Sequence, residues 1–131
     1  MTTGWYTEEV MRLSDKELLE LAARSVGMND YHYAPGWNAM AKYLENDPKK
    51  GFVWSTYWNP LVDMNDAMNL ASALGLVVDF SRPSANFPYE SPVMWIDQFM
   101  DNMQLAARSI VLAAARRQFM SEKKEIGRNM K

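Results

Sequence analysis

His32 is the only histidine of the 131-residue chain, and cysteine is absent. Acid–base or nucleophilic catalysis would therefore need His32 and a carboxylate that folding brings to it. Tyr31 and Tyr33 flank His32, so the simpler interpretation is a packed or half-exposed residue of a strand. The lack of cysteine excludes disulfides, thiolate chemistry and the common zinc motifs. We expect no cofactor and no metal site.

Carboxylates and glycines carry no clear nucleotide-binding signal. Neither G-x-G-x-x-G nor G-x-x-x-x-G-K-[ST] occurs. Asp63 and Asp66 fall at the start of an expected helix, where capping and the helix dipole favour acidic residues. They would repel a phosphate at the turn formed by residues 59–66. Capping is therefore the better interpretation of these two carboxylates.

Aromatic residues form the most suggestive cluster. Such side chains stack on ligands, anchor protein interfaces or fill a core. For any single member the core is the simpler interpretation, but we expect at least one to face a pocket or a partner. The cluster consists of Trp37, Trp54, Tyr57 and Trp58, and Asn59 adjoins it.

Arginines on the expected helices suggest a second surface. Arg108, Arg116 and Arg117 could form a basic stripe for an acidic partner, although a cation near a helix C-terminus is favourable by itself. The formal net charge of -2 argues against a nucleic-acid-binding protein. The candidate binding residues are thus Trp37, Trp54, Tyr57, Trp58, Asn59, Arg108, Arg116 and Arg117.

Capping signals predict the helices that must position these residues. Ser14 and Glu17 form a capping box, and Gly27 is placed to end the helix that follows. A second helix is expected from Asp63 or Asn65 to a stop at Gly75. Residues 101–122 predict a long final helix, because the apolar and alanine positions recur at helical spacing after another capping signal.

Strands are expected between these helices. The aromatic and β-branched stretches at residues 31–33, 52–58 and 76–80 favour strands, and residues 46–51 read as a turn. Two segments stay ambiguous: residues 37–44 could instead form a helical turn, and residues 93–100 are either a strand or the first turns of the final helix.

One domain spanning residues 1–131 is expected, with an N-terminal arm at residues 1–12 and a frayed tail at residues 125–131. The chain starts without a basic and apolar leader and has no run of about 18 apolar residues, so we expect a cytoplasmic protein without a membrane segment. A surplus of apolar residues predicts a homodimer. They are Met94, Ile96, Phe99, Met100 and Met103.

Three segments resemble a group of small phage and prophage proteins of unknown function, the phage α-β-α sandwich (NinX-like) group. They are the helix at residues 18–27, the W-N-P-L turn with its D-A-x-x-L-A helix at residues 58–76, and the alanine-rich helix at residues 106–115. The resemblance covers about half of the chain. It implies helices packed on a small antiparallel sheet in a phage accessory protein, and it transfers no catalytic residues.

The fold class expected is therefore α+β, with a small antiparallel sheet of about three to four strands and two to three helices in an α-β-α-like sandwich. The leading functional interpretation is a phage-encoded, non-enzymatic protein that binds a host factor, in counter-defence against the host. Two alternatives stay open: a small-molecule or nucleotide binder with a pocket lined by Trp54, Tyr57 and Trp58, and an enzyme that uses His32 and a carboxylate.

Overall fold

The computed structural model describes the backbone of residues 7–47 and 51–129, and the side chains of residues 8–42 and 57–124. The described helices are α1 (Thr7–Met11), α2 (Asp15–Ser25), α3 (Met64–Leu74) and α4 (Asn102–Asn129). The described strands are β1 (Tyr31–Ala34), β2 (Ala39–Asp47), β3 (Gly51–Trp58), β4 (Val77–Asp79) and β5 (Ser84–Asn86). This is the expected α+β class.

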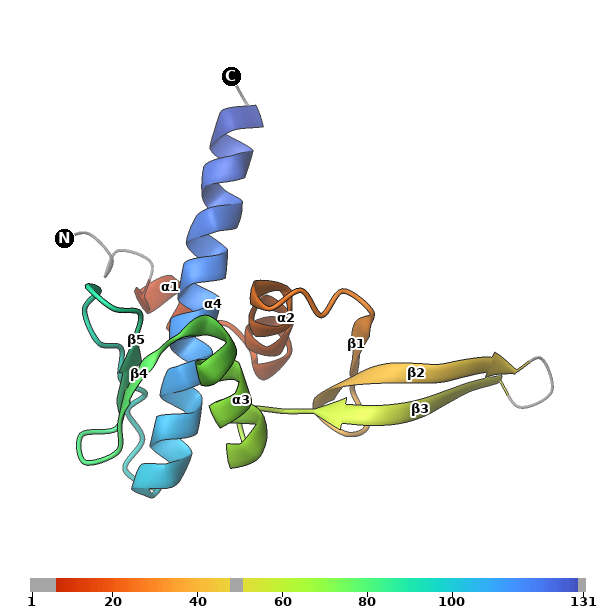
Figure 1. Ribbon diagram of the computed structural model, residues 1–131, viewed down its shortest axis with the longest axis horizontal. Helices are drawn as coiled ribbons and strands as arrows, with labels where there is room; N and C mark the ends of the chain where they lie inside the picture. The colour runs from red at the N-terminus through yellow and green to blue at the C-terminus, as the bar shows by residue number, and fades with distance from the viewer. Residues whose placement is uncertain (1–6, 48–50, 130–131) are drawn as a thin grey trace.

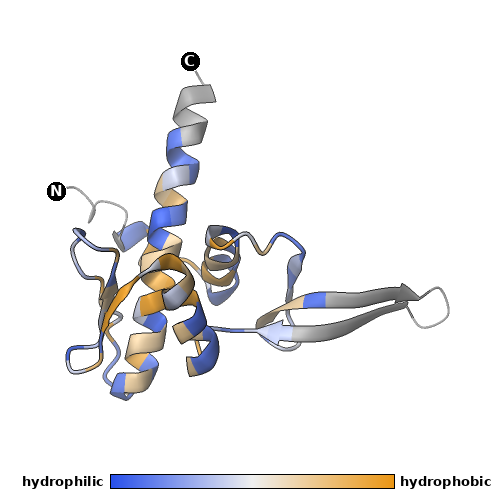
Figure 2. Cartoon of the chain, in the orientation of Figure 1, coloured by the Kyte–Doolittle hydropathy of each residue, from blue (hydrophilic) through white to orange (hydrophobic). Residues whose placement is uncertain are grey.

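Helix α4 is the centre of the fold. The other helices and the β4–β5 pair pack around it, as Figure 1 shows. Its middle stretch, from Ile110 to Ala115, is buried on every side. A helix that is apolar all round must be enclosed by other elements. Hydrophobic segments accordingly gather along this part of α4 in Figure 2.

The predicted caps are present at each long helix. Ser14 and Glu17 form the reciprocal capping box of α2, and Gly27 follows that helix with a φ of 74°. Asp63, rather than Asn65, caps α3, and Gly75 ends it in the left-handed conformation. At the start of α4 the backbone N–H of Asp101 donates to Gln104, whose own N–H donates back to the Asp101 carboxylate. Local sequence thus sets the helix ends.

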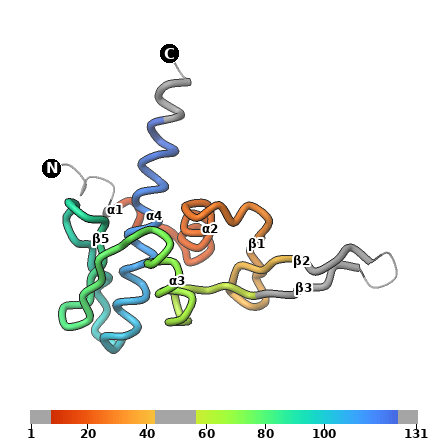
Figure 3. Tube along the Cα trace, in the orientation of Figure 1, coloured from red at the N-terminus to blue at the C-terminus, as the bar shows by residue number. Residues whose placement is uncertain are grey.

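The strands form two separate antiparallel sheets, ordered β1-β2-β3 and β4-β5. The three-stranded sheet meets the helices on one side, where β1 and β2 contact α2. The β2–β3 hairpin then projects away from the helices, as the ribbon in Figure 1 shows, and the coloured base of the hairpin in Figure 3 leads out from beside α3. The helices therefore enclose α4 and do not stack on a common sheet, and the α-β-α-like sandwich is not confirmed.

Several expectations about elements need correction. The expected small antiparallel sheet is present with three strands, but a second sheet of two strands, which was not expected, accompanies it among the described residues. Residues 93–100 are neither strand nor helix: Val93 makes an isolated bridge to Ala85, and irregular backbone follows. Residues 39–47 are strand, which removes the alternative of a helical turn there. The predicted turn at residues 46–51 falls partly on residues 48–50, outside the described part.

The ends of the chain also differ from the simplest expectation. Val10 of α1 is fully buried in the core cluster, so the described part of the predicted N-terminal arm packs onto the body. Helix α4 continues to Asn129, beyond the expected end near Glu122. Among the described residues, no helix is long and apolar enough to cross a membrane.

Candidate functional site

The three-stranded sheet has a face that packs on the body and a face that does not. Residues directly opposite one another on neighbouring strands share a face. The row of Tyr33, Met40 and Trp58 lies on the inner face, because Met40 and Trp58 belong to the core cluster. The neighbouring row, His32, Ala41 and Tyr57, must lie on the opposite, outer face, since successive residues alternate.

The outer face carries an exposed aromatic pair. Trp37, in the turn between β1 and β2, packs against Tyr57 with ring centroids 5.1 Å apart and planes tilted by 44°. Trp37 is 65% exposed and Tyr57 is 43% exposed. Tilted packing at this distance is a favourable aromatic geometry. We call His32, Trp37 and Tyr57 the outer aromatic face.

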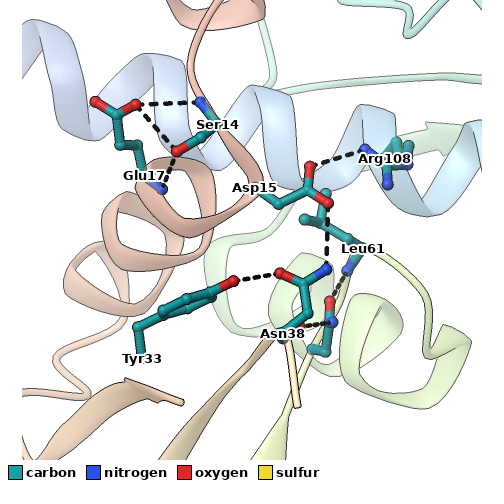
Figure 4. Close-up of polar contacts among 8 residues, drawn as sticks. Ser14, Asp15, Glu17, Tyr33, Asn38, Leu61 and Arg108 are labelled. Carbon is teal, nitrogen blue, oxygen red and sulfur yellow. Dashed lines mark hydrogen bonds and ion pairs between the residues drawn. The ribbon is translucent and has the colours of Figure 1, made fainter. Parts of the chain in front are cut away.

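A polar junction fixes the turn that bears Trp37. Asn38, the next residue, has a φ of 46°, a conformation that asparagine tolerates better than most residues. Its side chain accepts a hydrogen bond from the Tyr33 hydroxyl, and its carbonyl accepts one from the Asn59 side chain at 2.6 Å. The Asn38 amide donates to Asp15 at 3.5 Å (Figure 4). The aromatic turn is therefore tied to both sheet and helix.

Asn59 and Asp15 connect this junction to the body. The Asn59 side chain accepts from the backbone N–H of Leu61 at 3.0 Å, as Figure 4 shows. Its own backbone N–H donates to Asp66 at 2.9 Å. The Asp15 carboxylate forms an ion pair with the guanidinium of Arg108 in α4 at 3.3 Å. The W-N-P-L segment thus works as a corner in which Asn59 joins strand, turn and α3.

Asp66 is held inside that corner. Burial raises the pKa of its carboxyl, more than the hydrogen bond from Asn59 lowers it, and the neighbouring Asp63 adds to the rise. Both carboxylates already have backbone donors: Asp63 accepts from the N–H of Asp66, and Asp66 accepts from that of Asn59. This supports capping as the role of these residues.

The three arginines are engaged within the molecule. Arg108 pairs with Asp15 and lies over the Trp95 ring at 5.0 Å. Arg116 is only 2% exposed, and it contacts Glu90 at 3.4 Å and the carbonyl of Ser91 at 3.3 Å. Burial lowers the pKa of its guanidinium, against the opposite effect of Glu90.

Arg117 completes this pattern. It pairs with Glu90 at 3.1 Å and covers the Phe87 ring at 4.4 Å. Glu90 therefore sits between two arginines and holds the loop before residue 93 against α4. These contacts argue against an open basic stripe, because two of the three arginines are largely buried and all three face acidic partners.

The described members of the predicted aromatic cluster lie on two different faces of the sheet. Trp37 and Tyr57 come together on the outer face, whereas Trp58 is 9% exposed and belongs to the core. Neighbouring residues of a strand face opposite sides, so Tyr57 and Trp58 do not line one pocket. Trp54 is paired with Tyr43 in the register of β2 and β3, and its side chain lies outside the described part.

Hollows on the described surface are small, and one of them reaches His32 at the edge of the outer aromatic face. One, of about 230 Å³, lies between α2 and β1 and includes Arg24 and Tyr31; another, of about 210 Å³, lies between α2 and α4 beside Phe119. Sites for drug-sized ligands are usually about 300 to 1,000 Å³. Neither hollow is lined by Trp37 or Tyr57. No group of three or more metal-ligating side chains occurs among the described residues.

Sequence reasoning missed the junction residues Tyr33 and Asn38. The signal was present: Asn38 follows Pro35, Gly36 and Trp37, a tetrapeptide of turn-forming type. Its partners Asp15 and Arg108 are far apart in the sequence, and no local pattern relates them.

No protein-family model matches the chain, and searches of curated proteins and of solved structures found no match either. The likeness to phage proteins therefore stays a prediction from the three sequence segments.

Proposed function

We propose that this chain is a phage-encoded, non-enzymatic accessory protein that binds a protein of the bacterial host through the outer aromatic face. The observation that carries the proposal is the exposed Trp37–Tyr57 pair. Aromatic residues concentrate binding energy at protein interfaces. A pair that is already packed loses little side-chain freedom when a partner covers it.

The chemistry of the face favours a protein partner over a nucleic acid. Its described side chains are the partly or fully exposed His32, Trp37 and Tyr57 above the buried alanines Ala34, Ala39 and Ala41, and none of them carries a fixed charge. Single-stranded nucleic acids bind to aromatic platforms that lie beside basic grooves. Lys42 belongs to the inner face and pairs with Asp30 at 3.0 Å, so it does not supply such a groove.

The phage setting comes from the sequence resemblance, and counter-defence against the host is the role we propose for it. The small-molecule alternative has less support, because Tyr57 and Trp58 lie on opposite faces of the sheet and the hollows that the described residues form are small.

A paired capture experiment tests the proposal. The tagged chain, a Trp37→Ala/Tyr57→Ala variant and an Ile96→Ala/Phe99→Ala control are incubated with lysate of the bacterial host. The control removes an apolar pair that is more exposed than Trp37 and Tyr57, since Ile96 is 81% and Phe99 88% exposed, and that lies outside the sheet, in the irregular stretch before α4. We expect one host protein to be retained by the first and third baits and lost from the second. Equal retention by all three baits, or retention by none, would contradict the proposal.

Thermal unfolding of each bait serves as the folding check. The outer-face variant removes exposed side chains and a ring contact worth about 0.5 to 1.5 kcal/mol, so it should stay folded at the capture temperature. Reconstituting the complex from the purified host protein then gives the affinity that each substitution changes.

A further inference from the structure

Strand β3 has a second edge with which no strand of the described chain pairs. The sheet order is β1-β2-β3, so β3 forms hydrogen bonds to β2 on one side only. Among the described residues, no strand pairs with its other side. The row of backbone N–H and C=O groups along such an edge is a template for another strand.

The composition of β3 puts no protecting side chain on this edge, although its pairing with β2 is irregular around Tyr43, where Ser55 falls outside the regular register. Its sequence, GFVWSTYW, contains neither a charged residue nor a proline. Natural edge strands are usually blunted by lysines, prolines, bulges or shortness. The opposite edge strand, β1, illustrates such protection: it has only four residues, and Pro35 follows it directly.

The projecting half of the hairpin adds to this argument. Beyond Lys42 and Thr56 the ladder consists of β2 and β3 alone, because β1 pairs no farther than Lys42. Figure 1 shows this part of the hairpin leaving the helical body. Two isolated strands are marginally stable in water. The sequence nevertheless places three apolar residues in succession, Phe52, Val53 and Trp54, on this segment.

We infer that the free edge of β3 pairs antiparallel with β3 of a second copy of this chain, and that the protein is a two-fold symmetric dimer. Under a two-fold axis, the backbone donors and acceptors of a strand edge can pair antiparallel with the same groups of a second copy. The edge is therefore complementary to itself and needs no other surface of the chain. Because β3 is uncharged, the pairing opposes no like charges. The result is a six-stranded sheet, a common size.

The dimer would also extend the proposed binding surface. Tyr57 belongs to β3, so the outer aromatic faces of the two copies would share one sheet. The inference itself does not depend on the proposed function, because it uses only the backbone edge and the composition of β3.

Cysteine scanning supplies the decisive measurement, because the natural chain has no cysteine. Single variants Val53→Cys, Trp54→Cys, Ser55→Cys and Thr56→Cys are oxidised under mild conditions and compared with Ser72→Cys on the exposed side of α3. We expect disulfide-linked dimers from one or two neighbouring β3 positions, those closest to the two-fold axis, and none from position 72. Cross-linking at position 72 alone, or at no position, would overturn the inference.

Light scattering and sedimentation equilibrium on the full chain give the second readout. The natural chain should be a dimer, and Ser55→Lys should weaken the dimer about tenfold or more, because it adds a charge to an otherwise uncharged edge strand in each copy. Ser72→Lys is the matched control and should leave the dissociation constant unchanged. A chain that is monomeric throughout would overturn the dimer, as would a dimer that is indifferent to Ser55→Lys and joined at another surface.

Discussion

The helical body and the three-stranded sheet differ in how completely their side chains are buried. Around α4, residues from Ile110 to Ala115 have no exposed surface, and even Arg116 is buried beside Glu90. In the sheet, the inner row of Met40 and Trp58 is buried, whereas Trp37 and Tyr57 stay open on the other side. The body can supply stability for the whole chain, which leaves the sheet free to expose aromatic residues.

A small polar junction is what couples the two regions. Asn38 and Asn59 join the turn of the sheet to the W-N-P-L corner, and Asp15 with Arg108 extends the contact to α4. Substitutions in the body, in the junction and at the ion pair of α2 and α4 should therefore differ in how much stability they remove and in which elements they affect.

The largest effect is expected from Leu112→Ala, in the fully buried part of α4. Removing a core leucine leaves a cavity and costs about 2 to 5 kcal/mol. Because α4 contacts the other helices and the β4–β5 pair, we expect the whole body to lose stability in chemical denaturation. The half-exposed Met103→Ala is the control and should change stability by less than about 0.5 kcal/mol. Similar losses in both variants would contradict the central role of α4.

The second-largest loss of stability is expected from Arg116→Ala. It removes a buried cation and leaves Glu90 with Arg117 alone. Breaking a fully buried pair costs about 3 to 5 kcal/mol, and the partly exposed Glu90 should reduce this to about 2 to 3 kcal/mol. Arg117→Ala, which removes the more exposed partner of the same carboxylate, should cost less than about 1 kcal/mol. Equal costs, measured by urea unfolding, would argue against a buried clamp.

Asn38→Ala tests the junction, and we expect a loss of about 1 to 2 kcal/mol. Alanine loses the side-chain hydrogen bonds and disfavours the φ of 46°. Asn38→Gly keeps the backbone conformation and removes only the polar contacts, so it should cost less. Hydrogen exchange should rise at β1 and β2 while the amides of α4 stay protected. Uniform loss of protection would mean that body and sheet unfold as one unit.

The smallest effect is expected at the ion pair of Arg24 and Glu122. The guanidinium donates to the carboxylate at 2.7 and 3.0 Å and holds the pKa of Glu122 below its ordinary value. A carboxylate with a lowered pKa in the folded state adds stability above its unfolded pKa, and this is lost as pH falls through the folded value. Glu122→Gln should therefore cost about 0.5 kcal/mol at pH 7, because the pair is partly exposed.

Unfolding at several pH values checks this last prediction. The difference between natural chain and Glu122→Gln should disappear in acid, below the lowered pKa, and should shrink in high salt. A difference that is constant across this range would show that the contact acts by packing and not by charge.

Local patterns in the sequence indicated where the long helices start and much of the strand content. Capping residues act within one turn of their own helix, so Ser14 and Asp101 marked the starts of α2 and α4, and Asp63 or Asn65 narrowed the start of α3 to two candidates. The long final helix and the strand at residues 52–58 were likewise predictable from spacing. The irregular stretch at residues 93–100 was not, because its bridge to Ala85 and its link from the Trp95 N–H to Ser109 depend on distant partners.

The candidate site, too, was predictable from the sequence only in part. Its residue types were visible in the sequence, since Trp37, Tyr57 and Trp58 stand out as an aromatic cluster. Which aromatic is buried depended on the register of the sheet: the pairs Met40–Trp58 and Ala41–Tyr57 send neighbouring residues to opposite faces. The arginines also looked available in the sequence, and only folding brought Asp15 and Glu90 to them.

The sequence by itself determined the α+β class and where the principal helices begin, because caps, spacing and turn residues act over a few positions. The tertiary structure decided that α4 is enclosed, that the three-stranded sheet stands apart from it, and that Trp37 and Tyr57 meet on the open face. Those outcomes depend on contacts between residues far apart in the chain, which short-range patterns do not encode.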